Sequence, residues 1–276
     1  MAGLYVKDLG VWKLPKSVWI KAGSVWRVCS NVYVKHNGSW REMMKTVTIS
    51  GSQTNFNLYN YVGRPSQPLN LIVTIPANVT IFSSDQQLTY NIPPRTTAFT
   101  VGAFPAGSTV IINNNGYISG GGGFGGSGAG KQSNGPNYTS ITGAKGGDGS
   151  YGIIKGGSGY TCTIVNTGTI AGGGGGGGGA GRIDGGGIST SYITGADGGY
   201  AAGITGYSNR IGQLGTKSPS FNQNVSGNGG NCGQNGTAGG GYGSTAYGGG
   251  PGGTGRPAIG SGIEIAVSGT ILGGIG

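Results

Sequence analysis

Glycine is concentrated in one part of this chain, and its distribution limits the folds open to it. Of the 67 glycines among 276 residues, 8 lie before residue 116 and the other 59 lie in 116–276. A stretch in which more than a third of the residues lack a side chain cannot build an ordinary hydrophobic core. Abundant glycine usually accompanies disorder, but here the glycines are periodic and charge is sparse, which argues against a disordered segment.

The glycine tracts repeat with a period of three. Glycines recur at every third position in 143–152 and again in 227–239. A polyproline II-type helix has three residues per turn, so this spacing leaves one edge of the helix bare. Bare edges let helices approach until the backbone N–H and C=O groups of one pair with the next. The sequence therefore predicts packed polyglycine II helices with connecting loops. Collagen is excluded, because it needs an unbroken Gly-X-Y register and abundant proline.

A second repeat combines short strands with these glycine runs. "VIINNNGYISGGGG" begins at Val110, "CTIVNTGTIAGGGG" at Cys162 and "IEIAVSGTILGGIG" at Ile263. Recurring units of this kind indicate a stacked or parallel architecture. Residues 46–115 contain β-branched segments separated by Asn, Pro, Gly and Ser, which is typical of an ordinary β region. The expected fold class is therefore mostly β and irregular.

The first 45 residues carry three copies of a fourteen-residue pattern. Two sets of aromatic residues recur at this spacing: Tyr5, Trp19 and Tyr33, and then Trp12, Trp26 and Trp40, each of these tryptophans followed by Lys or Arg. Alternation bounded by Gly or Asn-Gly turns predicts three β-hairpins. Their tryptophans could form the core of a small β-domain or anchor the hairpins to a partner. The scarcity of aliphatic residues between the hairpins favours docking.

The net charge of +10 is densest in this N-terminal segment. Residues 1–45 hold eight Lys or Arg against Asp8 and Glu42. The bases stand singly beside aromatics and do not form a run, which disfavours nucleic acid as a partner. A basic face that docks onto another protein, or that is simply solvated, fits the pattern better.

Catalytic and metal-binding patterns are missing from the sequence. His36 is the single histidine, so one chain cannot supply a histidine-based triad or a multi-histidine metal site. The seven acids are dispersed, and "GGSGAGKQ" lacks the Ser or Thr of a phosphate loop. We therefore expect no enzymatic activity, cofactor or metal. Three scattered cysteines fit assembly in a reducing compartment, and we expect neither a signal peptide nor a membrane span.

Segments between the tracts have the composition of binding loops. Residues 131–142, 182–194 and 216–226 are rich in Asn, Ser, Thr and Tyr. Tyrosine supplies rigid amphipathic area, and Ser and Asn supply adaptable hydrogen bonds. The alternative interpretation is that these segments are polar turns.

Together, the glycine tracts alternating with polar segments and the "VYVKHNGSWR"-type repeats resemble the receptor-binding adhesin at the long-tail-fibre tip of T-even-type bacteriophages. The resemblance implies a fibre-attachment domain in 1–45, a β-rich connecting region in 46–115 and a polyglycine II receptor-binding domain in 116–276. It also implies a location at the distal tip of the virion's long tail fibre, after assembly in the host cytoplasm.

The resemblance implies two protein partners. One is a trimeric tail-fibre protein, which a monomer caps with three equivalent hairpins. The expected fibre-binding residues are Trp12, Trp26, Trp40, Tyr5, Trp19 and Tyr33. The other partner is a bacterial outer-membrane protein, or a surface glycan. The expected receptor-binding residues are Asn137, Tyr138, Thr139, Ser191, Tyr192, Phe221, Asn222 and Tyr247. The alternative is a structural or assembly protein of the fibre that uses the tracts as a rigid spacer.

Overall fold

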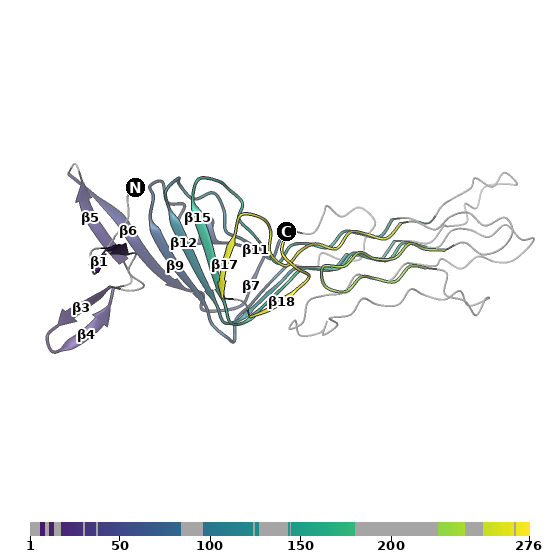
Figure 1. The fold of residues 1–276 in the computed structure, drawn as a ribbon, viewed down its shortest axis with the longest axis horizontal. Coiled ribbons are helices and arrows are strands. Elements are labelled where there is room, and N and C mark those ends of the chain that lie inside the picture. Colours follow the sequence, from purple (N-terminus) through teal and green to yellow (C-terminus); the bar gives the residue numbers. More distant parts are fainter. Residues whose placement is uncertain are drawn as a thin grey trace, which may run out of the picture.

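The computed structural model describes residues 6–8, 11–13, 18–29, 31–36, 38–83, 96–123, 125–126, 143, 145–179, 226–240, 251–267 and 269–276. These residues are mostly β, and the helix among them is the single turn α1 (Leu58–Tyr61). Along the longest axis of the molecule, strands β1 to β6 lie at one end and the glycine-rich tracts at the other, with parallel sheets between them (Figure 1).

Three sheets form the middle of the molecule, and the chain visits them in rotation. The first sheet contains β6 (Ser39–Thr48), β9 (Asn70–Ile75), β12 (Thr109–Asn114), β15 (Thr161–Asn166) and β17 (Glu264–Val267). The second contains β7 (Gln53–Thr54), β10 (Thr80–Phe82), β13 (Tyr117–Ser119), β16 (Thr169–Ala171) and β18 (Thr270–Leu272). The third contains β8 (Phe56–Asn57), β11 (Phe99–Thr100) and β14 (Ile153–Ile154), and bridges at Ile259 and Ile275 continue it. All neighbours among these strands pair in parallel.

This rotation makes a parallel β-solenoid. Each turn of the chain, here called a coil, adds one strand or bridge to each sheet. Alternate side chains point inward, as the period of two in a strand requires. Inward residues at equivalent positions stack into ladders: Val73, Ile112 and Ile164 in the first sheet, Ile81, Ile118 and Ile170 in the second, and Phe56, Phe99 and Ile153 in the third. All nine are buried, so stacked coils supply the hydrophobic core that the glycine-rich segments cannot.

The strand repeat seen in the sequence corresponds to three successive coils. β12 pairs with β15 in the register Val110 to Cys162, the same register in which the sequence repeats align. The prediction of stacked, parallel strands is therefore confirmed. The expected domain boundaries do not coincide with breaks in the sheets: β6 runs across position 45/46, and strands from 116–276 extend the sheets begun by 46–115.

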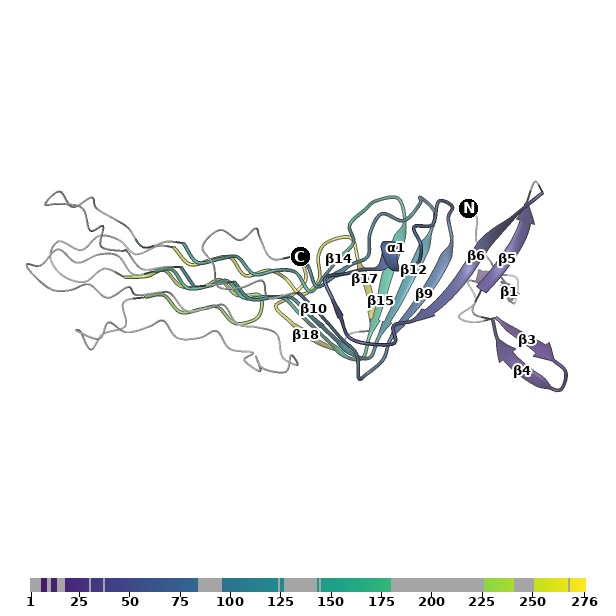
Figure 2. The ribbon, with the colours of Figure 1, turned by 180° about the vertical axis from the view of Figure 1, so that it is seen from behind.

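The glycine-rich segments enter the fold at one corner of the solenoid. Each leaves after a strand of the second sheet and returns to the third, between β13 and β14 in one coil and between β16 and Ile259 in the next. In the last described coil, two glycines, Gly273 and Gly274, make the same crossing with positive φ. Figure 2 shows the tracts leaving the body side by side. Insertion at a shared corner explains why the tracts all extend from the same side of the solenoid.

At the opposite end, six strands form three antiparallel pairs. β1 (Val6–Asp8) pairs with β2 (Val11–Lys13), β3 (Trp19–Ala22) with β4 (Val25–Val28), and β5 (Asn31–His36) with β6. The third pair is continuous with the first sheet, because β6 also pairs in parallel with β9. The turns at Gly23 and Gly38 have φ values of 65° and 81°, a region that favours glycine.

Candidate functional site

Hydrogen bonds at every third residue join the glycine tracts. The first two outgoing tracts lie parallel, and their amide-to-carbonyl bonds are Gly120 to Ala171, Gly123 to Gly174 and Gly126 to Gly177, at 2.7–2.8 Å. The tract at 234–240 also runs parallel to 172–179, because Gly175 donates to Gln234 and Gly178 donates to Thr237. Three described tracts therefore leave the solenoid in the same direction.

Three other tracts return toward the solenoid. Residues 145–152, 226–231 and 251–258 each run antiparallel to 172–179. Two amide-to-carbonyl bonds show the direction of each pair: Gly173 to Ser150 and Gly176 to Gly147, Gly227 to Gly178 and Gly230 to Gly175, and Gly253 to Gly176 and Arg256 to Gly173. The outgoing tracts are described as far as residues 126, 179 and 240, and the returning tracts are described from residues 143, 226 and 251. The segments 127–142, 180–225 and 241–250 consequently begin and end at the far end of the tracts.

The run of eight glycines at 172–179 is the central tract. It exchanges backbone hydrogen bonds with each of the other five described tracts. All eight residues are buried. A tract with neighbours on every side has no edge on which a side chain could point outward. At 172–175 and at Gly177, a Cβ would overlap a neighbouring carbonyl oxygen, so these positions require glycine. The outer tracts need glycine only where they face a neighbour, which explains their period of three.

Close backbone approach enforces this pattern. A Cβ at Gly146 would overlap the carbonyl oxygen of Gly176, and a Cβ at Gly177 would overlap that of Gly227. Between the tracts, Asp148 accepts hydrogen bonds from the Thr254 amide at 2.8 Å and from Lys145 Nζ at 3.0 Å. Burial raises the pKa of Asp148, but these two donors, together with the positive charges of Lys145 and Arg256, outweigh burial and hold that pKa below its ordinary value.

The expected receptor-binding residues lie outside the described residues. They are Asn137, Tyr138, Thr139, Ser191, Tyr192, Phe221, Asn222 and Tyr247. Each belongs to one of the segments 127–142, 180–225 and 241–250, whose described neighbours stand at the far end of the tracts. Because 120–126 and 172–179 run parallel, the segments 127–142 and 180–225 begin at the same end of the tracts.

Four of the expected fibre-binding residues have described side chains, and all four are exposed. Trp19 and Tyr33 are 53% exposed, Trp26 is 60% exposed and Trp40 is 69% exposed. The position of Trp12 opposite Lys7 is given by the β1–β2 register, and Tyr5 lies outside the described residues. Large aromatic side chains with this much exposed surface are unusual unless another molecule covers them.

Sequence reasoning based on aromatic residues missed the aliphatic side chains between them. Ile20 is 54% exposed, Val25 is 55% exposed and Val34 is 44% exposed. The strand alternation that predicted the hairpins also carried this signal, because it assigns these residues to the face opposite the tryptophans.

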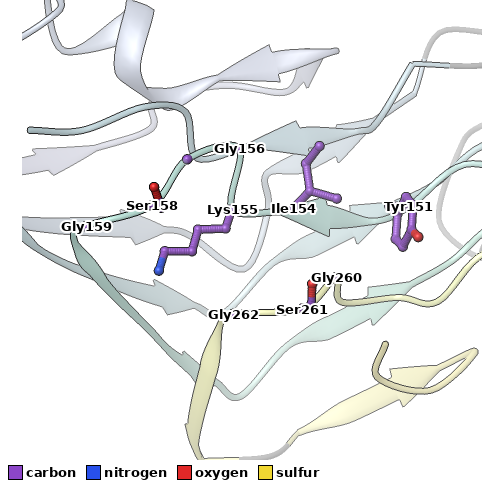
Figure 3. Close-up of a pocket in the computed structure, with 10 residues that line it drawn as sticks. Tyr151, Ile154, Lys155, Gly156, Ser158, Gly159, Gly260, Ser261 and Gly262 are labelled. Atoms are coloured by element: carbon purple, nitrogen blue, oxygen red, sulfur yellow. The ribbon is translucent and has the colours of Figure 1, made fainter. Parts of the chain in front are cut away.

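A cavity of about 520 Å³ lies beside the third sheet. It is lined mostly by backbone of 156–159 and 260–262, with the side chains of Tyr151, Ile154 and Lys155 at its edge (Figure 3). Lys155 Nζ lies 4.7 Å from the ring centroid of Tyr160, whose hydroxyl is within 2.7 Å of the carbonyls of Gly102 and Lys155. These contacts fix the connection between β14 and β15.

Metal-ligand geometry is absent from the part of the chain that the structure describes, where no three His, Cys, Asp or Glu residues cluster. Across the same residues, no helix has the length and apolar character needed to span a membrane.

Comparison with known proteins identifies the family. Residues 44–276 match the model of the family described as phage tail fibre adhesin Gp38. No curated protein matches the chain. Among solved structures, the chain is similar to the gp37–gp38 adhesin tip complex of the bacteriophage S16 long tail fibre, with 21% identity, a TM-score of 0.41, and coverage of 85% of this chain and 82% of that one. Because the family match covers most of the chain, the protein belongs to the phage tail fibre adhesin Gp38 family.

Proposed function

We propose that this protein is the receptor-binding adhesin at the distal tip of a phage long tail fibre. Its hairpins would attach it to the fibre, and the segments at the far end of its glycine tracts would bind a host outer-membrane protein. The observation that carries this proposal is the course of the tracts. Three run out and three return, so the described residues that flank the segments holding all eight expected receptor-binding residues stand at the end opposite the hairpins.

The tracts act in this proposal as polyglycine II helices. Hydrogen bonds and glycine contacts that recur at every third residue support this assignment, since the helix has three residues per turn. Close packing of backbones would make the bundle a rigid support, on which polar loops can vary without losing a hydrophobic core.

Attachment would occur on a trimeric fibre protein, with one adhesin for each trimer. Three antiparallel strand pairs with equivalent sequences support this stoichiometry, because each could contact one fibre chain. Native mass spectrometry of the co-expressed complex tests it. One adhesin is expected for three fibre chains, and a stable three-to-three complex would overturn the symmetry argument.

The alternative function is a structural or assembly protein of the fibre, with the tracts serving only as a spacer. Replacing Tyr138 and Tyr192 by Ala, separately and together, distinguishes the two functions by adsorption of the assembled phage to its host. We expect the double variant to adsorb poorly and a Tyr61→Ala control, changed at an exposed tyrosine of the body, to adsorb normally. Normal adsorption by fully assembled double-variant particles would favour the spacer.

A further inference from the structure

The second hairpin has two chemically different faces, and both are open. Successive strand residues point to opposite faces, so the β3–β4 register sorts the side chains into two sets. The tryptophan face holds Trp19, Lys21, Trp26 and Val28, and the aliphatic face holds Ile20, Ala22, Val25 and Arg27. Every one of these eight residues is exposed.

Exposure is about equal on the two faces. Ile20 and Val25 are 54% and 55% exposed, against 60% for Trp26. A two-stranded hairpin is marginal in water, and one with apolar side chains on both sides needs cover on both sides. A partner with a single flat surface could cover only one of them.

The other two hairpins repeat this arrangement in the same register. Lysine stands opposite tryptophan at Lys7 and Trp12, at Lys21 and Trp26, and at Lys35 and Trp40. On the other face, an aliphatic residue stands opposite a base at Val6 and Lys13, at Ile20 and Arg27, and at Val34 and Arg41. The fourteen-residue repeat therefore places a lysine–tryptophan pair and an aliphatic–base pair at equivalent register positions of all three hairpins.

Each face carries a base that is available to a partner. In the described part of the chain, no carboxylate pairs with Lys21, Arg27 or Lys35. The hairpin carboxylate with a described side chain, Glu42, lies 3.7 Å from Lys45 Nζ and 3.2 Å from the Tyr33 hydroxyl. A surface that fits these faces therefore combines apolar pockets with carboxylates at their rims.

We propose that each hairpin inserts edgewise into a cleft between two adjacent chains of the trimeric fibre protein. One wall of the cleft receives the tryptophan face and the other receives the aliphatic face, and carboxylates rim both walls. This inference rests on the proposed attachment to a fibre. A trimer has three chain boundaries, which matches three hairpins, and each fibre chain then contributes to two clefts.

Binding of the full-length protein to the purified trimeric fibre protein tests the two faces separately. Trp26→Ala alters the tryptophan face. The double variant Ile20→Thr/Val25→Thr alters the aliphatic face while keeping β-branched residues that favour strands. Val267→Thr, at an exposed position on β17, is the matched control, and circular dichroism checks the fold of each variant.

We expect both face variants to bind at least about tenfold more weakly than the wild type, as truncation of buried anchors commonly does, and the control to bind normally. Lys21→Gln and Arg27→Gln should each weaken binding and reduce its dependence on salt, because each removes a charge at one rim. Weakened binding by Trp26→Ala with wild-type binding by the aliphatic-face variant would overturn the cleft and leave fibre attachment standing. Wild-type binding by every variant would overturn attachment through the hairpins, and no binding by the wild type would overturn attachment itself.

Discussion

Asn114 and Asn166 are 52 positions apart, yet the side-chain amide of Asn114 donates a hydrogen bond to Oδ1 of Asn166 at 2.7 Å. Both residues are buried at the end of first-sheet strands, in neighbouring coils. Asn114 Oδ1 also accepts from the amide of Gly116, and Asn166 Nδ2 reaches the carbonyl of Thr270 in the next coil. This ladder fixes the corner from which the chain turns toward the second sheet.

Asn166→Ala should destabilise the solenoid by about 1–3 kcal/mol, because it leaves the buried amide of Asn114 without its acceptor. Denaturant unfolding measures the change in free energy. Asn78→Ala removes the same group from an exposed position and should change stability by less than about 0.5 kcal/mol. Equal stability of the two variants would show that the ladder contributes nothing.

Gly146→Val should disrupt the packing of the tracts, because its side chain would overlap the backbone of Gly176. Overpacking in a close-packed interior costs about 1–3 kcal/mol or more. Gln234→Val places the same residue at an exposed position of another tract and should be tolerated. Hydrogen exchange at the amides of 172–179 reports the difference, with faster exchange expected only for Gly146→Val.

The link between the tracts at Asp148 should weaken in acid. The folded-state pKa of Asp148 lies below the ordinary value of 3.8. The ionised carboxylate therefore stabilises the folded protein when the pH is above about 3.8. The contribution is lost as the pH falls through the folded pKa. Asp148→Asn should therefore lower Tm at neutral pH and flatten the fall of Tm below about pH 4. Identical pH profiles for the variant and the wild type would contradict this role.

The cysteines should differ in reactivity toward an alkylating reagent. Burial raises the pKa of the Cys162 thiol to about 12, so almost no reactive thiolate forms at neutral pH. Cys162 and Cys232 are both buried, whereas Cys29 is partly exposed. Mass spectrometry after brief treatment with iodoacetamide should find Cys29 modified in the native protein, and all three thiols modified after unfolding. Rapid labelling of native Cys162 would contradict the stacking of β12 on β15.

The sequence predicted the later coils well because a glycine run follows the second-sheet strand of each one. Val110 and Cys162 stand at the same place in two copies of one pattern, and parallel pairing follows from that identity. The sequence predicted a separate β region for the earlier coils, because residues 46–100 contain no glycine runs that would mark the repeat. Strands of two residues, such as β8 and β11, are also too short to show a period.

The candidate site could be predicted only in part. Aromatic spacing located Trp19, Trp26 and Trp40, whose exposure the structure then gave. The aliphatic face was missed, since Ile20 and Val25 look like ordinary strand residues until the register shows that nothing described covers them. The central position of 172–179 depends on contacts among segments far apart in the sequence, which a local period cannot reveal.

The lateral hydrogen bonds between tracts also determine how the molecule responds to a mechanical load. A pull between the hairpins and the far ends of the tracts acts along the tract axes, perpendicular to those bonds. The bonds of each tract are then sheared together, so that separation requires many to break at once. Peeling, which opens bonds one after another, would need a sideways force. Under the proposed function, a virion tethered through these tracts and swept by flow would load this fold in its stronger direction.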